Sequence, residues 1–196
     1  MNKDVIMAKV ISAFPGCGKS TYYKKWSQYS PENVWRCKNN GNQVYCIGWP
    51  TVPVGDKIID CDSSLFSWIY DENGNKTNVR NPDFPNNYIQ YIKEHLEIDD
   101  IIFISTHKVV RDALRENGIA YTLVYPQKDM LHEFTRRYKD RGDTEEFINH
   151  ITDKWDEFID EMDQETFPKK IVLHPSVWYD SITIALIDDI MGRGEI

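Results

Sequence analysis

The 196-residue sequence has no run of eighteen apolar residues, so we expect no segment that crosses a membrane as a helix. It has no excess of basic residues either: the formal net charge is −8 at pH 7, whereas proteins that bind duplex DNA are usually basic. Residues 1–5 carry an early acid and lack the pattern of a signal peptide. We therefore expect a cytoplasmic protein without a membrane or duplex DNA as partner. The acidic balance still leaves room for a local basic pocket.

Paired cysteines, internal repeats and linkers are absent as well. The four cysteines form no Cys-x-x-Cys pair and have no histidine nearby at zinc spacing; they are Cys17, Cys37, Cys46 and Cys61. In a reducing compartment we expect them to be free thiols. The chain length, without a dividing linker, predicts a single α/β domain over residues 1–196.

The rest of the sequence is organised around residues 13–21, Ala-Phe-Pro-Gly-Cys-Gly-Lys-Ser-Thr. The apolar, β-branched residues 5–11 predict a short strand before this stretch, and residues 19–28, which lack Pro and Gly, predict a helix after it. Glycines let backbone N–H groups surround an anion, and the helix directs its positive end at the same place. Strand, glycine loop and helix together predict a phosphate-binding loop.

We expect this loop to hold the phosphates of ATP together with Mg²⁺. Lys19 can reach the β- and γ-phosphates, Ser20 offers a hydroxyl to Mg²⁺, and Thr21 is placed for a further phosphate contact. The expected nucleotide-binding residues are Pro15, Gly16, Cys17, Gly18, Lys19, Ser20 and Thr21.

Two positions in the loop need comment. Ala13 stands where the Walker A pattern has its first glycine, which costs little if the φ angle of Ala13 stays negative. Cys17 is either a small residue that fills a tight turn or a thiol activated by Lys19 and the helix dipole. The lack of a resolving cysteine favours the first interpretation.

The next predicted strand, over residues 57–62, ends in two acids. Asp60 and Asp62 are two positions apart, which places them on the same face of an extended chain. Ligands of parallel α/β sheets bind at the carboxyl ends of strands, so either acid can accept a proton from an acceptor hydroxyl, or hold the acceptor or a metal. Asp62 also begins a helix-capping signal, with a helix expected over residues 64–69. Both roles stay open for Asp62.

The remaining segments alternate between strand and helix, which predicts about five parallel strands with helices on both faces, a three-layer α/β fold. We expect a hairpin over residues 34–49, a proline-rich loop over 78–87 and helices over 86–96, 108–117, 145–162 and 181–191. Further strands are expected at 101–106, 119–125 and 171–173.

Other candidate ligands lie near the expected carboxyl edge of this sheet. Arg80, in the predicted loop over 78–87, either clamps a phosphate or is a solvated surface charge. His107, after the strand at 101–106, either contacts phosphate or substrate or caps the next helix. The predicted helix over residues 128–141 holds four cations in six positions: Arg136, Arg137, Lys139 and Arg141. Its position favours neutralisation of a transferring phosphoryl group over a solvated helix face.

With these residues in view, the chain resembles P-loop kinases of the nucleoside-monophosphate-kinase type and their gluconate-kinase and polynucleotide-kinase relatives. It also resembles small P-loop proteins of bacteriophage genomes, which implies a phage- or bacterium-encoded protein of the host cytoplasm. The resemblance covers residues 5–28, 57–62 and 101–141. It implies ATP phosphates on the loop, an acceptor contacted by Asp60 or Asp62, and a basic lid over residues 127–142.

The resemblance implies a P-loop NTPase fold with residues 31–98 on the acceptor side. The expected activity is transfer of the γ-phosphoryl group of ATP to a nucleotide or nucleoside, with a (deoxy)nucleoside monophosphate as first candidate. Alternatives are a polynucleotide 5′-kinase, another small-molecule kinase, or a nucleotide-binding or sensing protein without turnover. The strand at 101–106 lacks the terminal aspartate of many ATPases, which weakens a hydrolytic motor more than a kinase.

The expected roles are divided among nine residues. The catalytic set is Lys19, Asp60, Asp62, Arg136, Arg137 and Arg141, the substrate-binding set is Asp62, Arg80 and His107, and the metal ligand is Ser20. The sequence carries no signal for an oligomeric state or for the identity of the acceptor.

Overall fold

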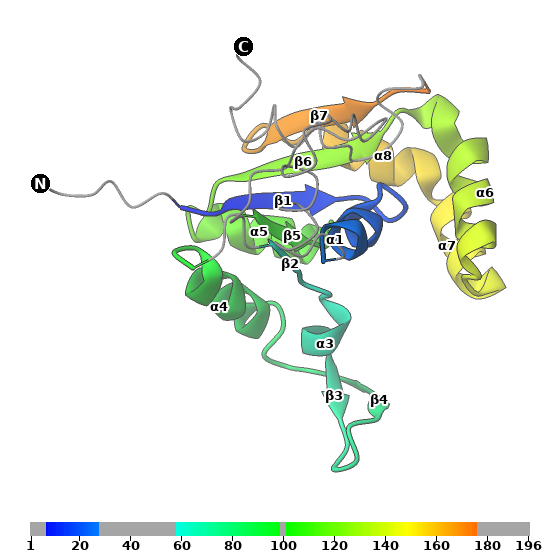
Figure 1. The fold of residues 1–196 in the computed structure, drawn as a ribbon. Coiled ribbons are helices and arrows are strands. Elements are labelled where there is room, and N and C mark those ends of the chain that lie inside the picture. Colours follow the sequence, from blue (N-terminus) through cyan, green and yellow to red (C-terminus); the bar gives the residue numbers. More distant parts are fainter. Residues whose placement is uncertain (1–6, 28–57, 99–100, 176–196) are drawn as a thin grey trace, which may run out of the picture.

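A five-stranded sheet forms the centre of the fold (Figure 1). The computed structural model describes residues 7–27, 58–98 and 101–175. The strands are β1 (Lys9–Ala13), β2 (Ile58–Asp60), β5 (Ile101–Ile104), β6 (Tyr121–Pro126) and β7 (Lys169–Leu173). They all run parallel, in the order β2–β5–β1–β6–β7. This confirms the predicted α/β class and the expected number of strands.

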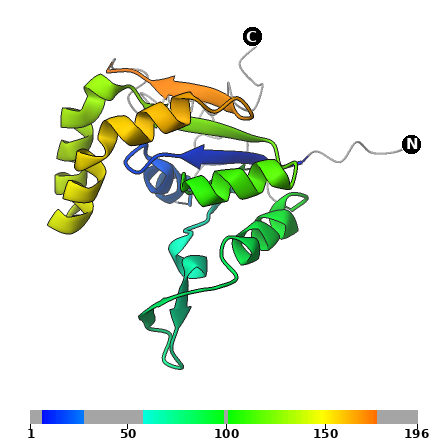
Figure 2. The ribbon, with the colours of Figure 1, turned by 180° about the vertical axis from the view of Figure 1, so that it is seen from behind.

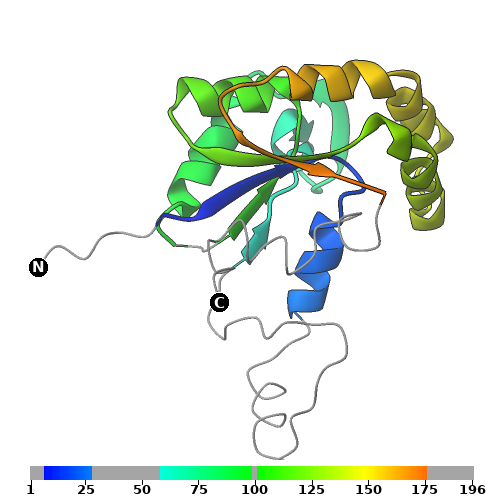
Figure 3. The same cartoon turned by 90° about the horizontal axis from the view of Figure 1, so that it is seen from above.

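Helices cover both faces of this sheet (Figures 2 and 3). Helix α1 (Lys19–Ser27) lies on one face, and α5 (Lys108–Glu116) and α8 (Trp155–Asp163) lie on the other. Every residue of β5 is buried, as expected for a strand that is covered on both sides. The arrangement is therefore a three-layer one, with β1 at the centre of the sheet.

The carboxyl ends of the strands point toward a pair of helices beyond the sheet (Figure 1). A short 3₁₀ turn, η1 (Lys128–Met130), leads into α6 (Leu131–Arg141), and Gly142 ends that helix with a φ of 81°. Helix α7 (Glu145–Asp153) follows. The predicted single helix over 145–162 is wrong, because Lys154 leaves helical geometry at φ −108° and ψ 14° and separates α7 from α8.

A hairpin projects from the β2 side of the sheet (Figure 1). Strands β3 (Trp68–Tyr70) and β4 (Lys76–Arg80) pair antiparallel after a single helical turn, α3 (Ser64–Ser67). The predicted helix over 64–69 is therefore too long: Trp68, an aromatic residue that favours strands, pairs with Arg80 instead. The predicted loop over 78–87 is wrong at its start, since Arg80 lies in β4.

Helix α4 (Asn86–His95) follows this hairpin within the bounds that the sequence predicts. No helix in the described part of the chain combines the length and apolarity needed to cross a membrane. The predicted hairpin over 34–49 and the predicted helix over 181–191 lie outside the described residues.

An ion-pair cluster around the buried Arg111 joins α5 to α8. Arg111 is 1 % exposed, and its guanidinium pairs with Glu161 and, at 2.9 Å, with Glu165. The Tyr121 hydroxyl of β6 donates to the second oxygen of Glu165 at 2.7 Å. Helices α5 and α8 are thereby fixed to each other and to the sheet.

Candidate functional site

The glycine loop connects β1 to α1 at the carboxyl edge of the sheet. The Phe14 N–H donates to the carbonyl of Val124 in β6 at 2.9 Å, so the loop starts in register with its neighbouring strand. Gly16 and Gly18 have φ angles of 85° and 96°. Every described non-glycine residue has negative φ, so Ala13 meets the condition under which it replaces a glycine at little cost. The strand–loop–helix arrangement is therefore as predicted.

The first turn of α1 presents the anion-binding features of this loop. The N–H groups of Lys19, Ser20 and Thr21 have no acceptor within the helix, and the helix dipole adds partial positive charge at the same end. The Lys19 ammonium donates to the carbonyl of Ala13, at the start of the loop. Burial lowers the pKa of Lys19, and the carboxylates of Asp60 and Asp62 oppose that shift. A bound anion would favour the charged form of Lys19 in the same way.

Ser20 and Asp60 meet beside the loop. The Ser20 hydroxyl donates to Oδ2 of Asp60 at 2.6 Å, although the two residues are forty positions apart. Asp60 is the last residue of β2, so the sheet topology carries this carboxylate to the start of α1. Mg²⁺ prefers such oxygen ligands and completes its shell with water and substrate phosphates. No cluster of three or more His, Cys, Asp or Glu side chains stands ready to hold a metal among the described residues.

Asp62 has a different local role from Asp60. Its Oδ1 accepts the N–H of Ser64 at 2.8 Å, which holds the start of α3. The capping role is therefore present, and the acceptor role stays a prediction. Burial lowers the pKa of His107, and the Asp62 charge opposes that shift, so the two side chains interact electrostatically across the edge of the sheet.

His107 and Arg80 belong to two other elements of the structure, the segment before α5 and the end of β4. His107 precedes α5 without capping it through its side chain. The pKa of His107 is lowered chiefly by its partial removal from water and next by the positive charge of Arg80. Part of the His107 side chain still faces solvent. The Arg80 guanidinium lies over the ring of Trp68, 3.8 Å from the centroid, in a cation–π contact. Arg80 thus faces the hairpin and influences His107 through its charge.

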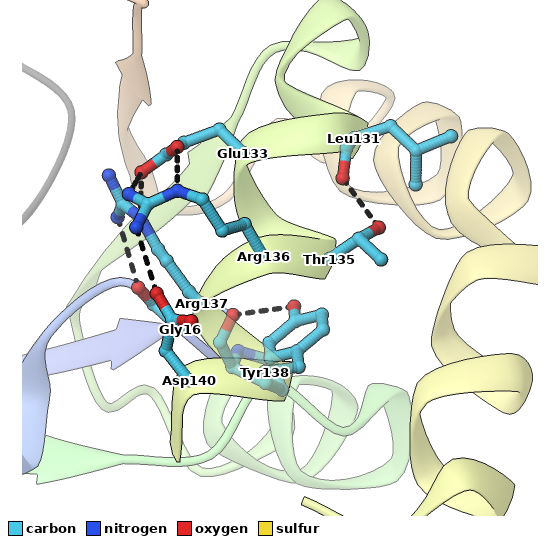
Figure 4. Close-up of polar contacts among 9 residues, drawn as sticks. Gly16, Leu131, Glu133, Thr135, Arg136, Arg137, Tyr138 and Asp140 are labelled. Atoms are coloured by element: carbon cyan, nitrogen blue, oxygen red, sulfur yellow. Dashed lines mark hydrogen bonds and ion pairs between the residues drawn. The ribbon is translucent and has the colours of Figure 1, made fainter. Parts of the chain in front are cut away.

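Helix α6 lies directly on the glycine loop (Figure 4). Arg137 donates through Nη1 to the carbonyl of Gly16 at 3.2 Å, and through Nε to Glu133 at 2.9 Å. The Tyr138 hydroxyl donates to the carbonyl of Pro15 at 2.9 Å. The predicted basic helix therefore reaches the loop, and Arg137 is the arginine that contacts it.

The other two predicted arginines are engaged within α6 and its end. Arg136 is 56 % exposed and pairs with Glu133 and Asp140 (Figure 4). Arg141 pairs with Asp143, and its charge still lowers the pKa of Lys19. Arg136 therefore lies away from the loop, while Arg141 lies within electrostatic range of it.

Cys17 is a filler of the loop. Its side chain is fully buried, its N–H donates to the carbonyl of Phe14, and its thiol faces the carbonyl of Val124. Burial raises the pKa of the Cys17 thiol to about 12. A protonated, enclosed thiol is a poor nucleophile, which favours the interpretation as a small residue in a tight turn.

Sequence reasoning missed the aromatic residues that support the site. Phe134 and Tyr138 lie on the predicted helix over 128–141 but were not named as site residues, yet they contact the loop at Gly16. Tyr88 of α4 donates its hydroxyl to the carbonyl of Cys61, between the two acids, at 2.7 Å. The apolar periodicity of their helices was visible in the sequence, but it does not reveal which partner each ring meets.

The fold and the site thus bring together a glycine loop, a helix N-terminus, a lysine, a serine–carboxylate pair and an arginine. Comparison of the chain with protein-family models and with curated proteins finds no match.

Proposed function

We propose that this protein is an ATP-dependent phosphotransferase of the P-loop kinase type. It moves the γ-phosphoryl group of ATP to a small acceptor, with a (deoxy)nucleoside monophosphate as the first candidate. The observation that carries the proposal is the hydrogen bond from Ser20 to Asp60 at the start of α1. It joins a hydroxyl and a carboxylate, the ligands of a magnesium–nucleotide, next to N–H groups suited to phosphates.

The nucleotide phosphates would lie on the loop backbone and the first turn of α1. Lys19 would exchange the carbonyl of Ala13 for phosphate oxygens, which compensates the burial that now lowers its pKa. Ser20 and Asp60 would hold Mg²⁺, which neutralises charge on the β- and γ-phosphates. Arg137 already lies at Gly16 and would add positive charge to the transferring group.

The acceptor would approach from the Asp62 side. Ser64 fixes one oxygen of Asp62, which orients the second oxygen toward an acceptor. For a hydroxyl acceptor, Asp62 would take the proton; for a phosphate acceptor, no proton need be removed and Asp62 would only orient it. The charge of Asp62 acts on His107, so His107 would contribute to acceptor binding on the same side.

A nucleotide-binding protein without turnover is the second candidate. The observation that favours it is the end of β5, where Ser105 follows Ile104 and no carboxylate stands beside β1. Nucleotide affinity alone does not separate the two candidates, because both need the loop and Lys19.

The test is phosphoryl transfer from ATP–Mg²⁺ to a panel of acceptors: ribo- and deoxyribonucleoside monophosphates, nucleosides and a 5′-hydroxyl oligonucleotide. Transfer that is lost in Lys19→Ala supports the kinase proposal and names the acceptor. ATP binding without transfer to any member supports the binding protein or an acceptor of another chemical class.

Variants of the two acids test the assignment of roles. We expect Asp60→Asn to weaken Mg²⁺-dependent ATP binding by about tenfold or more, since it removes a metal ligand. We expect Asp62→Asn to retain ATP affinity and to lower turnover, by about a hundredfold with a hydroxyl acceptor, the scale of general base catalysis. Asp153→Asn, an exposed change of equal charge on α7, serves as the control. If neither acid affects turnover, the roles given to them are wrong.

A further inference from the structure

The residue between the two acids is held at both of its backbone groups. The Cys61 N–H donates to the carbonyl of Phe103 in β5 at 2.9 Å. The Cys61 carbonyl accepts the hydroxyl of Tyr88 at 2.7 Å, from α4. Asp60 and Asp62 are its chain neighbours, so the position of Cys61 limits where both carboxylates can lie.

Tyr88 is itself fixed in place. It has no exposed surface, and its ring packs against Phe66 at 5.0 Å and Phe84 at 6.2 Å between centroids. Burial raises the pKa of Tyr88, so its hydroxyl stays a neutral donor. The preceding residue, Asn87, donates through Nδ2 to the carbonyl of Phe66 at 2.9 Å and ties the α3 segment to the same helix.

The hydrogen bonds continue across the sheet toward the glycine loop. Ser12, fully buried in β1 one residue before the loop begins, donates its hydroxyl to the carbonyl of Ser105 at 3.0 Å. At the end of β2, Asp60 accepts a hydrogen bond from the hydroxyl of Ser20, at the start of α1. The ends of β1, β5 and β2 are thus connected by polar contacts, and Tyr88 is the contribution of a helix outside the sheet.

We propose that Tyr88 is a positioning residue for the site: its hydrogen bond to the Cys61 carbonyl holds Asp60 at Ser20 and Asp62 at the acceptor side. This proposal rests on the proposed function, because it assigns Tyr88 to the same metal and acceptor groups. Tyr88 itself would contact neither the metal ion nor the acceptor. Its loss changes the geometry of the carboxylates rather than their chemistry.

The test is Tyr88→Phe, with Tyr125→Phe as the matched control. Tyr125 is equally buried, and its hydroxyl donates to Asp163 at 2.8 Å, in the cluster of β6 and α8. The readouts are the Mg²⁺ concentration for half-maximal ATP binding and the separate kcat and KM of turnover. We expect Tyr88→Phe to raise the Mg²⁺ requirement about tenfold, as loss of an outer-shell partner does, and to lower kcat more than it raises the KM for ATP. Tyr125→Phe should leave the Mg²⁺ requirement unchanged.

Two further variants keep the test specific to positioning. If Tyr88 acts through Asp60, the Asp60→Asn/Tyr88→Phe double variant should need no more Mg²⁺ than Asp60→Asn alone. Phe66→Leu, which loosens the ring without removing the hydroxyl, should shift the Mg²⁺ requirement in the same direction by a smaller factor.

The outcomes separate this proposal from the proposed function. Equal Mg²⁺ requirements for Tyr88→Phe and Tyr125→Phe, in a protein that binds ATP–Mg²⁺, overturn the positioning role and leave the function intact. The positioning role is also overturned if the effects of Asp60→Asn and Tyr88→Phe on the Mg²⁺ requirement add up in the double variant. A wild-type chain that binds no ATP–Mg²⁺ overturns the proposed function, and the positioning role with it.

Discussion

At the scale of single residues, Gly16 meets two demands at once. Its φ of 85° lies in the left-handed region that favours glycine. A Cβ atom at this position would also lie 2.9 Å from Cε1 of Tyr138 and 3.0 Å from Cδ1 of Phe134. The loop and α6 are therefore in contact at a point where only glycine fits.

We expect Gly16→Ala to destabilise the protein by about 1–3 kcal/mol from its backbone alone, with an added steric cost, and to weaken ATP binding about tenfold. Gly74→Ala is the control, because Gly74 has a similar φ of 78° but open space around its Cβ position. Chemical denaturation and ATP titration of both variants make the comparison. Equal losses in the two variants would contradict a steric contact between the loop and α6.

Single residues of the site differ in how far the sequence reveals them. Lys19, Ser20 and Asp60 were predicted because each follows from spacing within a strand, loop or helix. Tyr88 and Tyr138 were not, since their hydroxyls meet backbone carbonyls that only the folded chain brings near. Arg80 shows the reverse: its charge was noticed, but its contact with Trp68 was not predicted.

At the scale of elements, α6 contacts the loop through Arg137 and Tyr138, and Glu133 of the same helix holds Arg137. This carboxylate accepts hydrogen bonds from Arg136 and from Arg137, which itself reaches Gly16. These bonds, from Arg136 first and then Arg137, lower the pKa of Glu133 to about 2. Glu133 therefore fixes Arg137, the arginine that contacts the glycine loop.

This contact predicts a pH-dependent effect of Glu133→Gln on stability. The carboxylate titrates near 4.5 when unfolded and near 2 when folded, so its stabilisation is complete above pH 4.5 and is lost as pH falls toward 2. We expect the variant to be less stable than wild type at pH 7, with a difference that shrinks at pH 3. Urea unfolding at the two pH values measures it. A difference that stays constant between them would show that the Glu133 charge is not the cause.

Elements were predicted best where periodicity was strong and unbroken. The bounds of α4, α5 and α6 differ from prediction by one to a few residues. The segments around α3 and Lys154 were wrong, because a residue pair across a hairpin and a local change of φ decide them. Neither leaves a periodic signal. The movement of α6 as a lid stays a prediction, and its contacts with Pro15 and Gly16 are those it would have to break.

At the scale of the whole molecule, the buried Arg111 connects α5 to α8 through ion pairs with Glu161 and Glu165. We expect Arg111→Ala to destabilise the protein by about 3 kcal/mol or more, because it leaves Glu165, 13 % exposed, without its charged partner. Arg115→Ala on the same helix is the control: Arg115 is 48 % exposed, and its pair with Asp112 should contribute under about 1 kcal/mol. Thermal unfolding of both variants tests the difference. Similar losses of stability in the two variants would mean that the burial of Arg111 does not strengthen the contribution of its ion pairs.

The central position of β1 has a consequence for synthesis on the ribosome. Both strands that flank it come much later in the chain, since Lys9 pairs with Ile101 and Val10 with Tyr121. The Phe14 N–H of the glycine loop can form its hydrogen bond only after Val124 has been synthesised, because the Val124 carbonyl is the acceptor. Such distant pairing delays assembly, and a nascent chain shorter than β6 has no partner for this edge of the loop. On the proposed function, ATP present during translation would therefore stabilise only chains in which β6 has already left the ribosome.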